Sequence, residues 1–318
     1  MLGCLLIACG AGPAYGQIPF EVAGARALGM GGAFVGVAND PTAVHWNPAG
    51  LASGSLAGMT IGWDQLHFGD PNLPAVVGST RNAATLTSVA TYPLGISYGY
   101  LRAAQVVAIK EDGTPVVNSV TVHLFGGTVT QTIVKGLVVG ATAKYMRGQV
   151  ATGETTGFTN GDALEEGIKR NSDSDGAFDL DAGVMATIGW FQAGFTAKNL
   201  FQPTFVGDAG FATQLKRRYR LGFAALPTDG LTLAFDVDLD TADPLVGLRR
   251  MMAAGGEFRL GPSLELRGGV RWSRDGDKRP ISSIGASLKI RKGMWLDGYT
   301  TYSRSDDRGF GVAFRAGS

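Results

Sequence analysis

The stretch GARALGMGGAFVGVANDPTAVHWNPAGL, residues 24–51, decides how the rest of the chain is interpreted. It holds too many glycines for a stable helix interior, and it alternates too little for a long strand. Near its end, Asp40 is a good helix cap and Pro41 suits a first helical position, which predicts one or two turns over Thr42–Trp46. Asn47–Gly50 then ends that helix, because the residue before a proline avoids the α region and glycine permits a reversal.

Composition narrows the class of protein. The net charge of +1 gives no sign of a nucleic-acid partner. Glycine is about twice its usual share at 48 of 318 residues, whereas the 13 prolines argue against a disordered chain. After the first residues, no apolar run approaches the ~18 residues that a transmembrane helix needs. The apolar residues are dispersed at alternate positions, which favours a β-barrel with one oily and one polar face per strand.

The first residues resemble a secretory signal. Residues 1–16 combine a short apolar core with the small-x-small cleavage site Ala14–Gly16, but no basic residue precedes the core, which leaves open a start further upstream. The sequence Leu6–Cys9 also resembles a lipoprotein box, so acylation of Cys9 is an alternative. Cys4 and Cys9 are the chain's cysteines, and cleavage after residue 16 would leave no disulfide or thiol chemistry.

From Leu56 onward the pattern predicts fourteen strands. Residues 231–240, 264–272 and 283–291 alternate apolar and polar positions most clearly. A soluble sandwich would give the same alternation, so the lengths of the joins discriminate better. Tight joins are predicted near 92–94, 134–136, 189, 227–230, 260–263 and 291–293, and long ones near 67–83, 102–118, 150–175 and 199–215. Outer-membrane barrels alternate short periplasmic turns with long outside loops, and an even strand number puts both termini in the periplasm.

The glycine-rich stretch carries a family resemblance. Gly24–Phe34 followed by Trp46–Leu51 resembles the amino-terminal hatch of the FadL/TodX-like outer-membrane β-barrels, and is most similar to the shorter PorV/PorQ-type members. Residues 140–145, 178–184 and 194–200 resemble strands of the same superfamily. The expected organisation is a signal peptide over 1–16, a hatch over 17–55 and an all-β, fourteen-stranded transmembrane barrel over 56–318. A glycine-rich loop in another all-β protein is the alternative.

The resemblance also implies a function. It predicts a bacterial outer-membrane protein, inserted by the barrel-assembly machinery, that binds or transports hydrophobic or amphipathic small molecules such as fatty acids through a hatch-gated lumen. The alternatives are a PorV-like accessory barrel of type IX secretion, which docks or shuttles secreted proteins, and a purely structural barrel. The expected ligand and hatch residues are Phe34, Val35, Trp46, Asn47, Pro48, Ala49 and Gly50.

Charged residues alternate with apolar ones on the late strands. A charge at mid-depth on the lipid face would cost ~2–4 kcal/mol, so these residues are predicted to face inward and to pair across strands. Such a wall would brace the barrel, or guide the head group of an amphipathic solute. Smaller inward residues on the early strands, including Gly95, Ser97, Gly99, Gly140 and Thr142, would leave room for the hatch. The charged wall comprises Asp236, Asp238, Asp240, Glu257, Arg259, Glu265, Arg267, Arg271, Lys289 and Arg291.

Motifs for catalysis and metal binding are weak. Gly95–Gly99 fits G-x-S-x-G, but a nucleophile elbow needs a strand, a turn and a helix, whereas this segment is predicted to be continuous strand. The remaining hint is that Ser97 and His123 could both point inward. Asn171, Asp173 and Asp175 resemble the first half of a calcium loop, although its twelfth position lacks the usual glutamate. No enzyme activity, cofactor or firm metal site is expected.

Overall fold

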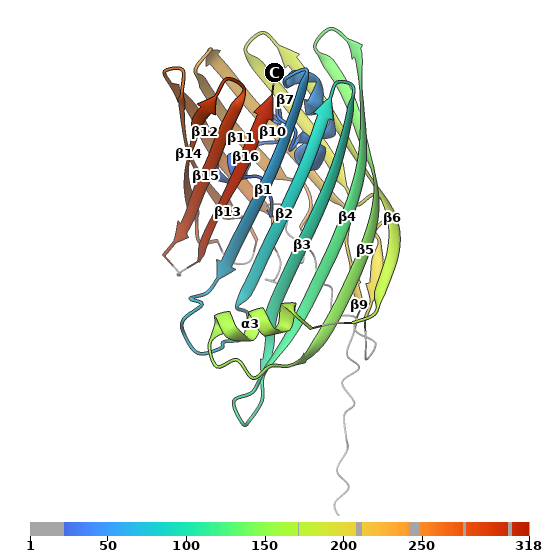
Figure 1. Cartoon of the computed structure of the whole chain (residues 1–318), viewed down its shortest axis with the longest axis vertical. Helices are drawn as coiled ribbons and strands as arrows, with labels where there is room; N and C mark the ends of the chain where they lie inside the picture. The colour runs from blue at the N-terminus through green and yellow to red at the C-terminus, as the bar shows by residue number, and fades with distance from the viewer. Residues whose placement is uncertain are drawn as a thin grey trace, which may run out of the picture.

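A computed structural model describes residues 22–170, 172–207, 212–241, 249–275, 278–304 and 307–317. Fourteen strands form a closed antiparallel barrel, in which the last strand pairs back onto the first (Figure 1). The predicted fourteen-stranded barrel is confirmed. The barrel strands are β1 (Ala57–Phe68), β2 (Thr80–Thr91), β3 (Leu94–Ile109), β4 (Pro115–Val134), β5 (Leu137–Glu154), β6 (Ser174–Ile188), β7 (Phe191–Lys198), β10 (Arg218–Thr228), β11 (Leu231–Asp238), β12 (Met251–Leu260), β13 (Leu264–Ser273), β14 (Ile281–Arg291), β15 (Met294–Ser303) and β16 (Arg308–Gly317).

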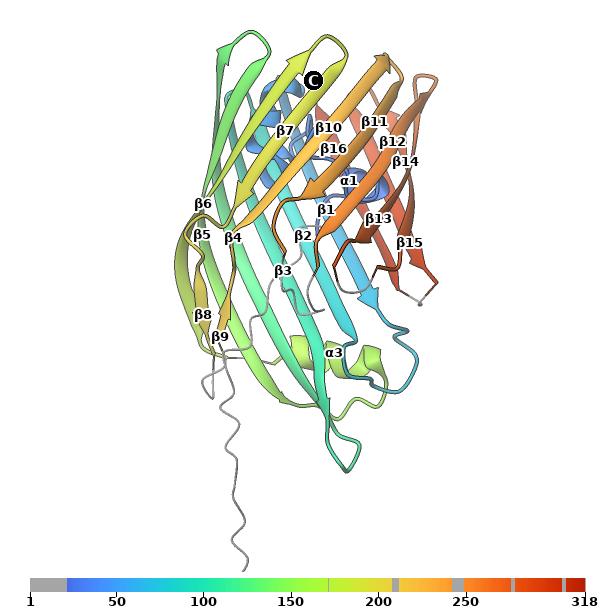
Figure 2. The same cartoon turned by 180° about the vertical axis from the view of Figure 1, so that it is seen from behind.

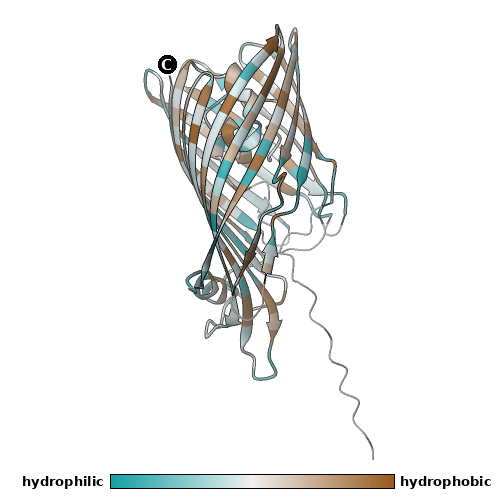
Figure 3. Ribbon diagram, turned by 90° about the vertical axis from the view of Figure 1, so that its right-hand side faces the viewer, coloured by the Kyte–Doolittle hydropathy of each residue, from teal (hydrophilic) through white to brown (hydrophobic). Residues whose placement is uncertain are grey.

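The period-two pattern sorts side chains between the two faces of the wall. Ile96, Phe125 and Ile284 point outward with exposed fractions of 65%, 51% and 66%. Their neighbours Gly95 and Gly126 face inward and are buried. Figure 3 shows hydrophobic and hydrophilic residues interspersed along the strands. A β-strand can separate two environments in this way because successive side chains point to opposite faces.

The two ends of the barrel differ in their connections. Every predicted tight join is a short turn, and these turns lie at the same end as the C-terminus (Figure 1). The predicted long loop over 102–118 is wrong, because β3 and β4 continue beyond the other strands and are joined only by residues 110–114. The long-loop end also carries α3 (Asn160–Ile168) and a small sheet of β8 (Thr204–Val206) and β9 (Ala212–Gln214). Among the described residues, no helix is long and apolar enough to cross a membrane.

Helix α3 lies against the outside of the barrel at the long-loop end (Figure 1). Gly167 sits on the outward-facing Val117 of β4, so closely that a Cβ at this glycine would lie 2.3 Å from a valine methyl. Glu165 forms ion pairs with Lys169 at 2.7 Å and with Arg81 of β2 at 3.2 Å. Hydrogen bonds from Lys169 and then Arg81 lower the pKa of Glu165 below its ordinary value. Packing and charge together fasten this helix to β2–β4.

The N-terminal segment, residues 22–53, lies inside the barrel near the tight-turn end (Figure 2); we call it the plug. It contains α1 (Ala25–Gly29), α2 (Ala43–Trp46) and the 3-10 helix η1 (Pro48–Ser53). A helix is present within the predicted Thr42–Trp46, but its N-cap is Thr42 and not Asp40, so Pro41 precedes the helix and is not its first residue. Helix α1 contacts β13–β16, whereas η1 contacts β4–β6 on the opposite wall. The plug thus spans the lumen from one side to the other.

Glycines of the wall let the plug approach the strands closely. A Cβ at Gly194 would lie 2.2 Å from the carbonyl oxygen of Val35, and one at Gly255 would lie 2.1 Å from that of Met30. Distances this short are impossible for real side chains, so the strand backbone itself forms the surface on which the plug rests. The wall glycines at which an added Cβ would lie less than 3.0 Å from a plug atom are Gly95, Gly140, Gly183, Gly194, Gly222, Gly255 and Gly269.

Replacing Gly255 by valine should therefore unseat the plug while the barrel still closes. Overpacking of this kind costs about 1–3 kcal/mol or more, and here the obstructing atom is backbone. Limited proteolysis should cleave the plug faster in Gly255→Val, whereas heat-modifiable gel migration should still report a folded barrel. Gly268→Val is the matched control, because a Cβ at this outward-facing glycine meets only the carbonyl oxygen of Ser283, at 3.9 Å. Equal cleavage of both variants would contradict this role for Gly255.

Candidate functional site

Carboxylates of the wall hold the backbone of the plug. Asp236 of β11 accepts hydrogen bonds from the N–H groups of Phe34 and Val35, both at 2.9 Å. On the other side, Asp64 of β1 accepts from the N–H of Gly24 at 3.0 Å. Both carboxylates are buried. Charge-assisted bonds from buried acceptors are strong, and they also satisfy N–H groups that lack partners within the plug.

An ion-pair ladder joins the plug to the late strands. Arg26 of α1 binds Glu257 through two nitrogens, at 2.7 and 2.8 Å. Arg267 then bridges Glu257 at 2.5 Å and Glu265 at 2.8 Å. Arg315 of β16 continues the ladder with a contact of 3.0 Å to Glu265. The inward-facing charges are therefore neutralised in a chain that starts on the plug.

The turn after α2 is fixed by Asn47. Its Nδ2 donates to the carbonyl oxygens of Val35 at 3.0 Å and of Val184 in β6 at 3.1 Å, while its Oδ1 accepts from the N–H of Ala49 at 3.2 Å. One amide side chain thus ties two parts of the plug to the wall. A Cβ at Gly50 would lie 1.9 Å from the carbonyl oxygen of Ala38, so the turn admits only glycine there.

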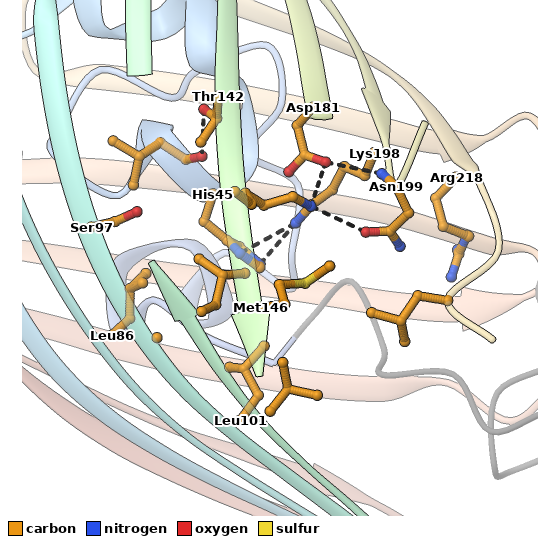
Figure 4. Close-up of a pocket in the computed structure, with 16 residues that line it drawn as sticks. His45, Leu86, Ser97, Leu101, Thr142, Met146, Asp181, Lys198, Asn199 and Arg218 are labelled. Carbon is orange, nitrogen blue, oxygen red and sulfur yellow. Dashed lines mark hydrogen bonds and ion pairs between the residues drawn. The ribbon is translucent and has the colours of Figure 1, made fainter. Parts of the chain in front are cut away.

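A cavity of about 60 Å³ lies between the plug and the β2–β6 wall, on the long-loop side of α2 (Figure 4). Val44 and His45 of α2 form its surface on the plug side. Its apolar lining comes from inward-facing positions of the early strands, and Leu215 adds a contact from the segment after β9. The apolar wall residues are Leu86, Leu101, Val122, Leu124 and Met146.

Charged residues gather at one end of this cavity. Lys144 contacts Asp179 at 2.7 Å and Asp181 at 2.6 Å. Lys198 lies 3.2 Å from Nδ1 of His45, so a wall cation meets the plug helix directly (Figure 4). Arg218 completes this end and pairs with Asp238 at 2.6 Å. The cavity therefore has an oily side and a charged end, the arrangement that an amphipathic molecule requires.

The small β8–β9 sheet lies between the cavity and the long-loop end of the barrel. Phe205 of β8 is fully buried and packs with Val122, Met146 and Leu215. A Cβ at Gly148 of β5 would lie 2.3 Å from the Phe205 ring, so this ring sits directly on the inner wall. The sheet thus covers the cavity from the side opposite the plug.

The residues predicted for the hatch come together in the plug. Phe34 and Trp46 are fully buried and pack edge to face with ring centroids 5.9 Å apart. Neither ring lines the cavity, which α2 reaches through Val44 and His45 instead. Val35, Asn47, Pro48, Ala49 and Gly50 are likewise buried against the wall.

The residues predicted for the charged wall divide into two groups. Glu257, Glu265, Arg267 and Arg271 are buried in the lumen, as are Asp236 and Asp238. Arg259 is half-exposed and contacts Glu265 at 3.3 Å, Asp240 pairs with Arg218 at 3.2 Å, and Lys289 lies 5.5 Å from the ring of Trp295. Arg291 departs from the expectation. It is exposed beside the tight turn, because a bulge shifts the register of β14 after Lys289.

The two other chemical motifs fail on geometry. Ser97 faces the lumen, whereas His123 points outward and bonds the Tyr98 hydroxyl at 2.9 Å, so the idea that both point inward is wrong. Of the calcium candidates, Asn171 lies outside the described residues, Asp173 is exposed, and Asp175 accepts from the N–H of Val206 at 2.7 Å. No group of three or more potential metal ligands occurs in the part of the chain that the structure describes.

Several residues of the site escaped the sequence analysis. Asp64, Lys144, Lys198 and Arg218 were not singled out, and Asp236 was expected to pair with a cation, not to bind the plug backbone. The sequence did contain one indication of their role. Each of these residues occupies a position that the alternation along its strand directs into the lumen, where a buried charge needs a partner. The partner itself lies far away in sequence, so alternation alone could not name it.

Similarity to solved structures is clear in fold and low in sequence. The structure superimposes with a TM-score of 0.67 on the CymD monoaromatic hydrocarbon channel, at 12% identity, covering 94% of this chain and 99% of that one. It also matches the Ralstonia pickettii toluene transporter TbuX, with a TM-score of 0.64, 13% identity and coverage of 93% and 98%. For a Pseudomonas aeruginosa FadL homologue the values are 0.61, 13%, 95% and 98%. The chain therefore has the fold of FadL/TodX-type hydrocarbon channel barrels.

Sequence comparisons add a partial match. The family model described as F plasmid transfer operon, TraF, protein matches residues 119–238, which run from β4 to β11. No sequence among the curated proteins matches the chain significantly. Two of these solved structures are described as a monoaromatic hydrocarbon channel and a toluene transporter.

Removing the Asp236 carboxylate should loosen the plug. Asp236→Ala leaves the N–H groups of Phe34 and Val35 buried without their acceptor, at a cost of about 1–3 kcal/mol each. Hydrogen exchange of these two amides should accelerate, and planar-bilayer recordings should show more frequent openings. Asp229→Ala, in the exposed tight turn of the same hairpin, should change neither measurement. Unchanged exchange in Asp236→Ala would show that the plug is held by other contacts.

Proposed function

We propose that this protein is an outer-membrane channel that binds hydrophobic or amphipathic small molecules and passes them through a plug-gated lumen. The observation that carries the proposal is the cavity against α2, with apolar side chains from β2–β5 and a charged end at Lys144, Lys198 and Arg218. At about 60 Å³ the cavity must widen to admit an acyl chain, which would then lie along the apolar side with its polar head at the charged end. The channel fold and the apolar outer face of the strands support placement in a bilayer.

The proposed route runs from the long-loop end to the tight-turn end. A ligand reaches the cavity when the β8–β9 sheet moves aside, and it then contacts Val44 and His45 of the plug. Loss of the Lys198–His45 contact would release α2 from β7, and the Asn47–Gly50 turn that follows α2 would then be free to shift. A shift of that turn opens the lumen inward, or sideways through the wall. The buried rings of Phe34 and Trp46 would line the opened path.

The proposal includes an orientation. The tight turns and the C-terminal end would lie in the periplasm, and the long connections with α3 would lie outside the cell, as short periplasmic turns and longer outer loops require. The alternating last strand, with Phe310 and Val312 exposed on its outer face, would serve recognition by the barrel-assembly machinery. No cofactor takes part.

Filling the cavity should block uptake without unfolding the protein. A Cβ at Gly99 meets only ordinary contacts, 3.6 Å from Leu124 and 3.9 Å from Leu86, so Gly99→Ala should fold and transport normally. The ring of Gly99→Phe would occupy the cavity instead. Uptake of a long-chain carboxylate into reconstituted vesicles should then fall roughly tenfold or more.

The two variants separate transport from folding. Both should show the same heat-modifiable migration as the unsubstituted protein, because the change lies on the lumen side of β3. If Gly99→Phe retains full uptake while folded, the cavity is not on the transport path. If neither the unsubstituted protein nor the variants take up long-chain carboxylates or monoaromatic hydrocarbons, the transport proposal fails.

A protein-docking role, as in PorV-like accessory barrels of type IX secretion, is the second candidate. Exposed apolar residues favour it: Val76, Val77 and Phe158 have exposed fractions of 55%, 57% and 78% at the long-loop end. The N–H of Ala75 bonds the carbonyl oxygen of Phe158 at 3.0 Å, so this apolar patch belongs to an ordered surface.

The patch gives a direct test of the second candidate. Affinity capture from membranes should recover large secreted proteins or secretion components, and Phe158→Asp should lose them. The control is Glu111→Lys, an exposed charge change in the turn between β3 and β4 at the same end of the barrel. Capture that is the same for both variants would count against docking at this patch.

A further inference from the structure

A continuous aromatic ladder runs along the outside of β3 and β4, on the face opposite the cavity. Phe125 packs on Tyr98 with ring centroids 5.1 Å apart, and the Tyr98 hydroxyl bonds His123 at 2.9 Å. The ring centroids of His123 and Tyr100 lie 4.6 Å apart. The guanidinium carbon of Arg102 lies 5.0 Å from the centroid of the Tyr100 ring. The ladder thus leads from an apolar end to a cationic end.

Two arginines at the cationic end have no acidic counterpart. Within the described ranges, neither Arg102 nor Arg147 forms an ion pair with a carboxylate, and Nε of Arg102 is buried without any hydrogen-bond acceptor. Arg147 is exposed and uses its own Nε to bond Ser174 at 2.8 Å. The inward-facing cations of the same wall behave differently, since Lys144 contacts two aspartates. A pair of outward guanidiniums without counter-charge suits an external anion.

An apolar groove of about 450 Å³ continues the ladder toward the tight turns. It is open to the outside and has Val89, Ile96 and Phe125 on its sides. Its floor is deep because Gly127 has no side chain, and a Cβ added there would meet nothing within 4 Å among the described residues. The groove is shaped for a flexible apolar chain that lies along the wall.

The height of Arg102 along the barrel axis matches the outer edge of the apolar band of a membrane barrel. Arg102 is as many residues from its tight turn at Pro93 as Tyr302, an exposed aromatic residue of β15, is from the turn at Gly293. With ~3.3 Å per residue and a tilt of ~40°, this distance is about 23 Å, close to the height of the apolar band of outer-membrane barrels. The arginines would therefore lie at the outer polar interface, with the groove beneath them in the hydrocarbon.

We propose that this surface binds one phosphorylated lipid of the outer leaflet, with its phosphate on Arg102 and Arg147 and an acyl chain in the groove. His123 of β4 lies between the strands that carry the two cations, because it pairs with Arg147 of β5 on one side and, on the other, with Tyr100, two residues before Arg102 on β3. The site depends on placement in the outer membrane but not on transport, since it uses the opposite face of β3 and β4 from the cavity. A channel without transport activity could still bind the lipid.

The test uses purified, full-length protein in detergent with diphosphorylated lipid A as the probe. Native mass spectrometry and thermal unfolding should show a bound lipid and a raised Tm. The double variant Arg102→Gln/Arg147→Gln should bind about tenfold more weakly. Gly127→Leu, which fills the groove, should also lose the lipid. Arg291→Gln, at the opposite rim, and Gly268→Leu, an outward glycine on β13, are the matched controls.

The outcomes are distinct. Weaker binding to dephosphorylated lipid A supports the phosphate contact, and failure of free pyrophosphate to compete identifies the lipid as the source of that phosphate. Full competition by pyrophosphate would replace the lipid site with a site for soluble anions and overturn the proposal. Equal binding by all variants, each folded by heat-modifiable migration, would also overturn it. Because uptake is not measured, none of these results depends on the transport proposal.

Discussion

Every polar group of the plug backbone must find a partner in a space that the barrel closes to water, and the structure depends on this constraint. Two means meet it. Wall glycines bring strand backbone to within contact of the plug, as where Gly194 meets Val35. Wall carboxylates then accept N–H groups that the plug's short helices leave unpaired, as Asp236 does for Phe34 and Val35. An isolated segment so rich in glycine could not hold this conformation, because its helices are too short to be stable alone.

Sequence patterns were sufficient for the architecture but not for the site. The alternation in β11, β13 and β14 predicted strands with two different faces, and the parity of the joins together with the family resemblance favoured a closed barrel over a soluble sandwich. The segment around Asp40 and Asn47 also predicted its own helix and stop. By contrast, the pairing of Asp64 with Gly24 or Lys198 with His45 depends on which strand reaches which part of the plug. These contacts are set by how the barrel closes around the plug, and no local sequence pattern predicts them.

The errors have local physical causes. A long loop was expected over residues 102–118, yet β3 and β4 continue there, because α3 covers the outward face of Ala104, Val106 and Val117 and removes the need for polar alternation. Arg291 left the lumen because of one bulge in β14. In both cases the strand departs locally from the regular alternation on which the prediction relied.

The plug and the cavity are coupled through one short helix. Helix α2 presents Val44 and His45 to the cavity, and its next residue, Asn47, carries the bonds that fix the plug to Val184. A ligand that displaces His45 from Lys198 therefore acts within a few residues of the principal fastening of the plug. In a close-packed interior, small shifts of this kind are transmitted and not absorbed. The same alternation that places the cavity on the inner face of β3 and β4 places the aromatic ladder on their outer face, so a substitution can alter one of the two surfaces without touching the other.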